Sequence, residues 1–371
     1  MSAVNWASVR EQFPALRNWT YLNTATFGQL PRRAVEASMR HFAHRDETAC
    51  ADFLDWYDDA DALRTEIARL IGATAEDIAF VPNASHALAM LVNGLMWRAG
   101  DRVVTLEHEF PNNLYVPALL RDSGVEFVEC AWERFHETVD ERTRLVLVSS
   151  VNYNTGFAPP LEEIAAVVHR HGGLLFVDGT QSVGALRFDA ARVQPDMLAV
   201  HGYKWLLAPP GAGFVYVRPD LRARLDPMVA GWRSHQDWRN VDNLHHGVPE
   251  YADAAEKYEG GGLPFSLLYA MRASVQMMLE IGPDAIEDRV LDLARQTREM
   301  LRELGARLED YASPIVAARF EGQDVSALAR HLKDRRIIVA ARKGALRVSP
   351  HFYNDASDLA VLRKSLSEPR P

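Results

Sequence analysis

The amino-acid sequence predicts an α/β protein, with a large domain built on a mostly parallel seven-stranded sheet sandwiched by helices and a small C-terminal α+β domain. Three observations support this class: short apolar runs typical of buried strands, segments of helical spacing between several of them, and a glycine cluster that precedes a mixed C-terminal region. Continuous apolar strands that alternate with helices are typical of a parallel sheet covered on both faces. The strand-like runs are residues 78–82, 102–106, 125–128, 145–149, 174–177, 197–200 and 213–217.

Helical spacing of apolar residues in the first part of the chain is clearest at 84–97 and 161–171. The segment Glu259-Gly-Gly-Gly-Leu-Pro264 then changes the pattern, because glycine and proline interrupt regular elements. We therefore expect a large domain of residues 15–258 and a small domain of residues 1–14 and 259–371. The small domain should contain helices at 265–281, 284–308, 325–333 and 356–366, and strands at 315–320, 337–341 and 345–349.

Composition argues against nucleic acid or a membrane as a partner. The 371 residues carry 41 Lys and Arg against 50 Asp and Glu, a formal net charge of −9, and contain no basic cluster. No apolar run approaches the roughly 18–20 residues of a membrane span, and the first residues lack a signal-peptide pattern. Cys50 and Cys130 are the only cysteines, which excludes a disulfide framework and favours a reducing compartment, so we expect a cytoplasmic protein. Neither His108-Glu109 nor His245-His246 has further ligands at metal-binding spacing, and no metal site is expected.

An acid and a lysine each follow an apolar strand, at Asp178 and Lys204. Enzymes that use pyridoxal 5′-phosphate (PLP) need such a pair. The lysine forms a Schiff base with the cofactor, and the acid keeps the pyridine nitrogen protonated so that the ring accepts electrons. Each residue also has an ordinary alternative, since most lysines are surface residues and Asp is a common N-cap.

The helix predicted after Asn83 offers a place for the cofactor's phosphate. Free backbone amides and the helix dipole favour a dianion at a helix N-terminus. We therefore assign the phosphate to Ala84 and to Ser85, whose hydroxyl adds a donor. Asn83 and Ser85 are also ordinary capping residues, so this pattern alone does not distinguish a phosphate site from a structural cap.

Four short motifs follow one another along the chain: Tyr21-Leu-Asn-Thr-Ala-Thr-Phe-Gly28, Asp178-Gly-Thr-Gln-Ser182, His201-Gly-Tyr-Lys-Trp205 and Arg347-Val-Ser-Pro-His351. Together they resemble the class V aminotransferase family of fold-type I PLP enzymes, over roughly residues 15–365. This family includes cysteine desulfurases, selenocysteine lyases, kynureninases and isopenicillin N epimerases. The resemblance implies a PLP cofactor, an amino acid as small-molecule substrate, and a homodimer with active sites at the subunit interface.

The resemblance implies roles for the residues around the cofactor ring. Lys204 matches the Schiff-base lysine and Asp178 the partner of the pyridine nitrogen. Gln181 is in the position that donates a hydrogen bond to the ring O3′ oxygen. Phe110 resembles the residue that stacks on the ring face, although an aromatic residue at such a place is more often part of the core.

The phosphate end is matched in a similar way. His201 and Tyr203 correspond to positions that reach the phosphate from the lysine loop. Gly262, in the glycine run 260–262, resembles the segment that approaches the phosphate from the other subunit, while the same glycines also suit a domain hinge. Leu263 departs from the family, in which a threonine often supplies a phosphate hydroxyl at this place.

Arg347 resembles the small-domain arginine that binds the substrate α-carboxylate through two parallel hydrogen bonds, a geometry that lysine cannot copy. A surface ion pair is the common alternative for an arginine in a strand. Further candidates are Asn23, Thr26 and Asn152, near the cofactor or the carboxylate, and Arg233 and His235, near the substrate side chain.

The fate of the substrate after loss of its α-proton distinguishes the members of this family. Cysteine desulfurases usually carry a cysteine shortly after the substrate arginine, and here no cysteine follows Cys130. We therefore favour β-elimination of the C–S lyase type without a persulfide cysteine, with transamination and epimerisation as alternatives. A non-catalytic PLP-binding sensor is a remote alternative, because it would carry an attached basic helix-turn-helix and this chain is acidic.

Overall fold

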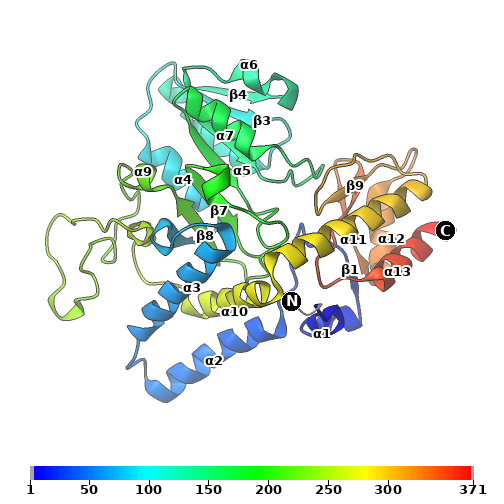
Figure 1. The fold of residues 1–371 in the computed structure, drawn as a ribbon, viewed down its shortest axis with the longest axis horizontal. Helices are drawn as coiled ribbons and strands as arrows, with labels where there is room; N and C mark the ends of the chain where they lie inside the picture. The colour runs from blue at the N-terminus through cyan, green and yellow to red at the C-terminus, as the bar shows by residue number, and fades with distance from the viewer. Residues whose placement is uncertain (1–3, 369–371) are drawn as a thin grey trace.

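The computed structural model describes residues 4–368, which form a large domain around a seven-stranded sheet and a smaller domain beside it (Figure 1). The sheet has the order β2-β8-β7-β6-β5-β3-β4, and within it β8 alone runs antiparallel to its neighbours. The predicted α/β class with a mostly parallel sheet is confirmed. The strands are β2 (Ile78–Val81), β3 (Arg102–Leu106), β4 (Glu126–Cys130), β5 (Thr143–Ser149), β6 (Leu174–Asp178), β7 (Met197–His201) and β8 (Gly213–Val217).

Helices cover both faces of this sheet and lead from it into the smaller domain (Figure 1). None of the helices within residues 4–368 combines the length and the apolar character that a membrane span requires. The α-helices are α1 (Trp6–Arg10), α2 (Arg32–Thr48), α3 (Asp55–Ile71), α4 (Ala84–Gly94), α5 (Pro111–Ala118), α6 (Phe135–Thr138), α7 (Leu161–Arg170), α8 (Ala190–Val193), α9 (Pro219–Arg222), α10 (Phe265–Ile281), α11 (Pro283–Glu303), α12 (Val325–Asp334) and α13 (Ala356–Ser367). Short 3₁₀ helices lie at Pro14–Arg17, Ala75–Asp77, Leu119–Ser123, Trp132–Arg134, Val241–Asn243 and Ala255–Glu259.

Alternate residues of the central strands point into two separate cores, one on each face of the sheet. In β5, Val146 and Val148 belong to the core that also contains residues of α3, α7 and α10. Leu145 and Leu147 belong to the core that contains residues of α4. A strand buried on both faces is apolar throughout, and for this reason the central strands are recognisable in the sequence.

Two helices, α2 and α3, are not among those expected from the sequence, and both pack against α10 (Figure 1). Helix α10 contributes Leu268, Met271 and Val275 to the core on one face of the large sheet. We therefore propose that the large domain extends to about residue 281, beyond the boundary at 258 that the sequence suggested.

The smaller domain has a core of its own around a three-stranded antiparallel sheet of order β11-β12-β9. Strand β1 near the N-terminus pairs in parallel with β10 of this domain, and Asn23 forms a bridge to Ser349 directly after β12. The segment that contains Asn23 and Thr26 is thereby held beside the strand of Arg347. The strands are β1 (Thr20–Tyr21), β9 (Val316–Ala318), β10 (Ile337–Ile338), β11 (Ala340–Arg342) and β12 (Ala345–Val348).

Candidate active site

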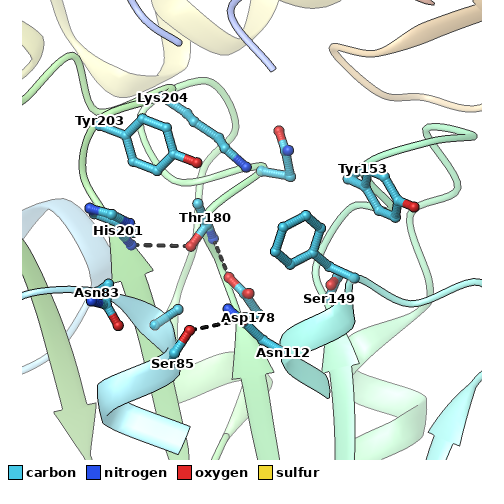
Figure 2. A pocket seen from close by; sticks show the side chains of 13 residues that line it. Asn83, Ser85, Asn112, Ser149, Tyr153, Asp178, Thr180, His201, Tyr203 and Lys204 are labelled. Carbon is cyan, nitrogen blue, oxygen red and sulfur yellow. Dashed lines mark hydrogen bonds between the residues drawn. The ribbon is translucent and has the colours of Figure 1, made fainter. Parts of the chain in front are cut away.

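A cavity of about 280 Å³ lies where β5, β6 and β7 end (Figure 2). Its walls come from these strand ends, from the N-termini of α4 and α5, and from the loop after β7. Ligands of open α/β sheets usually bind at this edge, outside the carboxyl ends of the strands. The lining residues are Asn83, Ala84, Ser85, Phe110, Asn112, Ser149, Tyr153, Asp178, Thr180, Gln181, His201, Tyr203 and Lys204.

Lys204 reaches into this cavity from the loop after β7 (Figure 2), and its side chain is almost fully buried. Its Nζ lies 5.5 Å from the ring centre of Phe110 and 5.3 Å from that of Tyr203. Among residues 4–368, no carboxylate lies within ion-pair distance of this nitrogen. Burial lowers the pKa of Lys204 to about 8, even though the Asp178 carboxylate acts in the opposite direction.

The loop that carries Lys204 packs tightly against the N-terminal segment. A Cβ on Gly28 would lie only 1.9 Å from the carbonyl oxygen of Lys204, so only glycine fits at this position. The Gly28 amide donates to the Tyr203 carbonyl oxygen at 2.9 Å. These contacts fix the backbone from which the Lys204 side chain extends.

Asp178 ends β6 and points into the same cavity as Lys204 (Figure 2). One of its oxygens, Oδ1, accepts a hydrogen bond from the Thr180 amide at 2.9 Å. The hydroxyl of Thr180 in turn accepts from the His201 amide at 3.1 Å, which ties the end of β6 to the end of β7. Thr180, which the sequence analysis did not single out, thus sets the position of the carboxylate.

Gln181 lies between Trp205 and the N-terminal segment. Its Oε1 accepts from the Trp205 indole at 2.8 Å, and its Nε2 donates to the Ala25 carbonyl oxygen at 3.1 Å. The amide nitrogen carries a second hydrogen that remains available to a ligand. His351 anchors Trp205 from behind through a 2.9 Å contact of its Nε2 with the Trp205 carbonyl oxygen.

The N-terminus of α4 faces the cavity and offers free donors. The Asn83 side chain caps this helix by accepting from the His86 amide at 2.9 Å, and the first intrahelical bond runs from Ala87 to Asn83. The amides of Ala84 and Ser85 precede that bond, so the helix does not satisfy them. Amides of this kind, together with the helix dipole, suit a phosphate or another anion.

Two further side chains stand close to this anion position. The Ser85 hydroxyl donates to Asn112 Oδ1 at 2.8 Å, and this contact holds α4 against α5 (Figure 2). Burial, with a contribution from Lys204, lowers the pKa of His201 to about 4, so the imidazole is neutral near pH 7. Its Nε2 lies 3.3 Å from the Gly211 amide and accepts that hydrogen.

Phe110 forms one wall of the cavity and makes an edge-to-face contact with Tyr153, with ring centres 5.2 Å apart. Behind it lies the buried carboxylate of Glu109, which accepts from the Ser149 amide at 2.6 Å and from Asn113 Nδ2 at 3.0 Å. Burial raises the pKa of Glu109. The Glu109 side chain thus supports the cavity wall. In the described part of the chain, no group of three or more His, Cys, Asp or Glu is placed to hold a metal.

Arg347 lies next to the cavity, on β12, and is 2% exposed. Its Nη1 donates to the Tyr153 carbonyl oxygen at 2.6 Å, and its Nη2 donates to Thr26 Oγ1 at 2.6 Å and lies 3.5 Å from Asn23 Oδ1. Three of the four predicted substrate-binding residues therefore form one cluster. Within residues 4–368 the Nε of Arg347 is buried and has no hydrogen-bond partner.

Other candidates lie apart from the cavity lining. The Oδ1 of Asn152 accepts hydrogen bonds from later amides of its own turn, and its Nδ2 donates to the His108 carbonyl oxygen. Asn152 therefore supports the loop that carries Tyr153. Gly262 does not line the cavity of its own chain, and a Cβ there would meet open space.

Arg233 and His235 are also occupied away from the cavity. Arg233 is fully buried, pairs with Glu259 at 2.7 Å, and lies over the rings of Tyr57 and Trp238. His235 stacks on His245 with ring centres 4.2 Å apart. Within this chain neither side chain is free to meet a substrate in the cavity.

The sequence and the fold both have relatives among known proteins. The family model described as aminotransferase class-V matches residues 20–367. An uncharacterised aminotransferase of Bacillus subtilis, YcbU, is 28% identical over 94% of this chain and 94% of its own length. The isopenicillin N epimerase of Amycolatopsis lactamdurans is 28% identical over 99% of both chains. The solved structure of the cystine C–S lyase C-DES with its reaction product cysteine persulfide matches with a TM-score of 0.88 and 23% identity, covering 97% of this chain and 100% of that one.

Proposed function

This chain belongs to the class V aminotransferase family of PLP-dependent enzymes, and we propose that it catalyses β-elimination from a cysteine-type amino acid as a C–S lyase. The observation that carries the catalytic part of this proposal is the shared cavity of Lys204 and Asp178, two residues that lie on separate segments of the chain. A buried amine and a buried carboxylate that face one ligand-sized space are the pair that PLP chemistry needs.

The free donors around the cavity fit this cofactor. We assign the phosphate to the amides of Ala84 and Ser85, and the ring O3′ oxygen to the unused hydrogen of Gln181 Nε2. Asp178 would hold a proton on the ring nitrogen, and Phe110 would cover one ring face. PLP supplies an aldehyde that condenses with amines and a protonated ring that accepts an electron pair from the substrate Cα.

The residues of this chain account for the remaining chemistry. Lys204, with a pKa lowered to about 8, exists partly as the free amine near neutral pH and can take the proton from the substrate Cα. Arg347 binds the α-carboxylate, and its unpaired Nε marks a donor that remains available to a ligand. After the proton has left Cα, the Cβ–S bond breaks and its electron pair leaves with the sulfur.

The arrangement of cysteines favours direct release of the sulfur fragment. Within residues 4–368, no cysteine lines the cavity. Cys130 is buried at the end of β4, where burial raises the pKa of its thiol, and Cys50 directly follows the residue that caps α2. Neither thiol is therefore placed to accept sulfur from a substrate in this cavity.

We also propose a homodimer in which Gly262 of one subunit completes the phosphate site of the other. Two facts support this arrangement. The predicted phosphate-binding glycine is absent from the cavity lining of its own chain, and the space around it is open.

The experiment that tests the proposal begins with the visible spectrum of the purified protein incubated with PLP. We expect a visible absorbance band that borohydride fixes covalently in the wild type, and no fixable cofactor in Lys204→Ala. A colourless wild-type protein would remove the cofactor assignment.

A panel of amino acids then separates the reaction types by their products. Pyruvate together with a released thiol or persulfide supports the lyase. A keto acid with the aminated cofactor would identify an aminotransferase instead, and inversion at Cα with uptake of solvent deuterium would identify an epimerase.

A further inference from the structure

A second arginine, Arg342, lies beside Arg347 at the end of β11 and is partly exposed. Its Nη1 donates to the neighbouring Ala341 carbonyl oxygen at 2.9 Å, and its Nη2 lies 3.5 Å from Thr26 Oγ1. The same hydroxyl accepts from Arg347 Nη2 at 2.6 Å. The two guanidinium groups therefore meet at a single neutral oxygen, with their Nη2 atoms separated by roughly 6 Å or less.

Neither arginine has a carboxylate partner among residues 4–368. The acceptors of Arg347 are carbonyl, hydroxyl and amide oxygens, and those of Arg342 are a carbonyl and the shared hydroxyl. Buried arginines elsewhere in this fold are neutralised, since Arg64 and Arg233 share the buried carboxylate of Glu259. Two adjacent unneutralised guanidinium groups repel each other, and this repulsion is relieved when anions bind.

At the end of the cavity near Arg342 and Arg347, positive groups outnumber negative ones. Lys204 is a third cationic group close enough for Arg342 and Arg347 to depress its pKa, and among the described residues Asp178 is the only acid in the cavity lining. The phosphate assigned to the N-terminus of α4 lies at the other end, beside Ala84 and Ser85. One α-carboxylate neutralises Arg347 and leaves the charge of Arg342 uncompensated.

We propose that Arg342 binds a second carboxylate, carried by the side chain of the substrate, so that the enzyme selects amino acids with an anionic side-chain end. This inference rests on the proposed function, in which Arg347 holds the α-carboxylate. For a C–S lyase, the substrate is then a cysteine derivative whose leaving thiol carries a carboxylate. Arg342 is a specificity-determining residue, and it is more exposed than Arg347, as suits the outer part of the substrate.

The test measures binding of two unreactive ligands of equal chain length to the PLP-loaded protein by calorimetry. Glutarate has two carboxylates, pentanoate has one, and neither has an amino group that could react with the cofactor. We expect glutarate to bind the wild type about 10- to 100-fold more tightly than pentanoate, the usual range for one added charge-assisted hydrogen-bonded contact. Arg342→Gln should abolish this preference and leave the Kd of pentanoate within about 2-fold of the wild-type value.

Two control variants locate the effect. Arg347→Gln should weaken the binding of both ligands, because it removes the α-carboxylate site. Lys343→Gln removes a neighbouring charge from the same hairpin, at a residue whose backbone oxygen accepts from Arg319, and it should keep the preference for glutarate.

Equal binding of the two ligands by the wild type would overturn the proposal. So would an Arg342→Gln variant that loses affinity for both ligands alike, because Arg342 would then be part of the α-carboxylate site. The visible band of the loaded protein is scored separately. Its absence would contradict the proposed function, whereas the ratio of the two dissociation constants reports on the arginine pair alone.

Discussion

Burial of the Lys204 amine lowers the stability of the folded protein, and it also prepares the amine for catalysis. Its folded-state pKa of about 8 lies below the 10.5 of an exposed lysine, so below pH 8 the folded protein carries a buried charge at a cost of about 3 kcal/mol. Between pH 8 and about 10.5 the unfolded chain binds more protons at this site, and stability rises with pH until the cost is gone.

We therefore predict that Lys204→Met stabilises the cofactor-free protein by up to about 3 kcal/mol at pH 7 and by clearly less at pH 9.5. Denaturant unfolding of both proteins at the two pH values measures this difference. Lys333→Met, at an exposed position, is the control and should change stability by no more than about 0.5 kcal/mol at either pH. A gain from Lys204→Met that did not change with pH would point to packing rather than to the buried charge.

At the same scale, the sequence identified residues whose chemistry depends on their place at a strand end. Asp178 and Lys204 follow apolar strands, and the parallel sheet brings strand ends to one edge, so their meeting was predictable. The positioning of Asp178 by Thr180 and the support of Phe110 by Glu109 were not predictable, because they depend on hydrogen bonds of a folded loop. Arg342 could not be identified from the sequence, because what distinguishes it is the lack of a carboxylate partner among the described residues of the folded chain.

Among the elements, α4 combines a structural and a functional role at one end. The Asn83 cap satisfies the His86 amide and leaves those of Ala84 and Ser85 turned toward the cavity. Asn83→Ala should lower the free energy of unfolding by about 1 kcal/mol, the usual effect of losing a cap. Because the first turn then loses its fixed geometry, we also expect PLP to bind about 5-fold more weakly, as measured by fluorescence or absorbance titration.

Helix α12 provides the matched control for this prediction. Asp324 caps it by accepting from the Ser326 and Ala327 amides, in the small domain and away from the cavity lining. Asp324→Ala should cost similar stability and leave the affinity for PLP unchanged. If both variants lost affinity equally, the effect would come from general destabilisation and not from the end of α4.

The elements differed in how readily the sequence revealed them. Six strands of the large sheet are largely buried and stand out as apolar runs, whereas most residues of the edge strand β4 are exposed or half-buried. Helix α10 was predicted with its observed bounds because its pattern is long and regular. Helix α2 was not foreseen, since Ala34 and His41 are its only buried residues. The predicted strand at 337–341 is divided in the structure, with β10 pairing with β1 and β11 pairing with β12. A choice of partner of this kind depends on the whole chain.

For the whole molecule, the outer face of α2 is a feature that a single chain does not explain. Val35, Met39 and Phe42 are 43%, 66% and 52% exposed and lie on one side of the helix at i, i+4 and i+7, while the other side packs on α10. An exposed apolar strip on a long surface helix is typical of a protein contact. The homodimer predicted from the family resemblance would cover such a strip with a second copy of the chain.

We predict that the wild-type protein has the mass of two chains in light scattering after gel filtration and that Met39→Glu shifts it toward one chain. A carboxylate at this position stays hydrated in the monomer and would lose its water without a partner in the dimer, so the dimer should weaken at least 10-fold. Thr65→Glu adds the same charge at an exposed polar position of α3 and should leave the mass unchanged. A wild-type protein of single-chain mass would contradict the dimer itself, and a Met39→Glu variant that remained dimeric would place the contact on a different face. In the first case Gly262 could not complete the phosphate site from a second subunit.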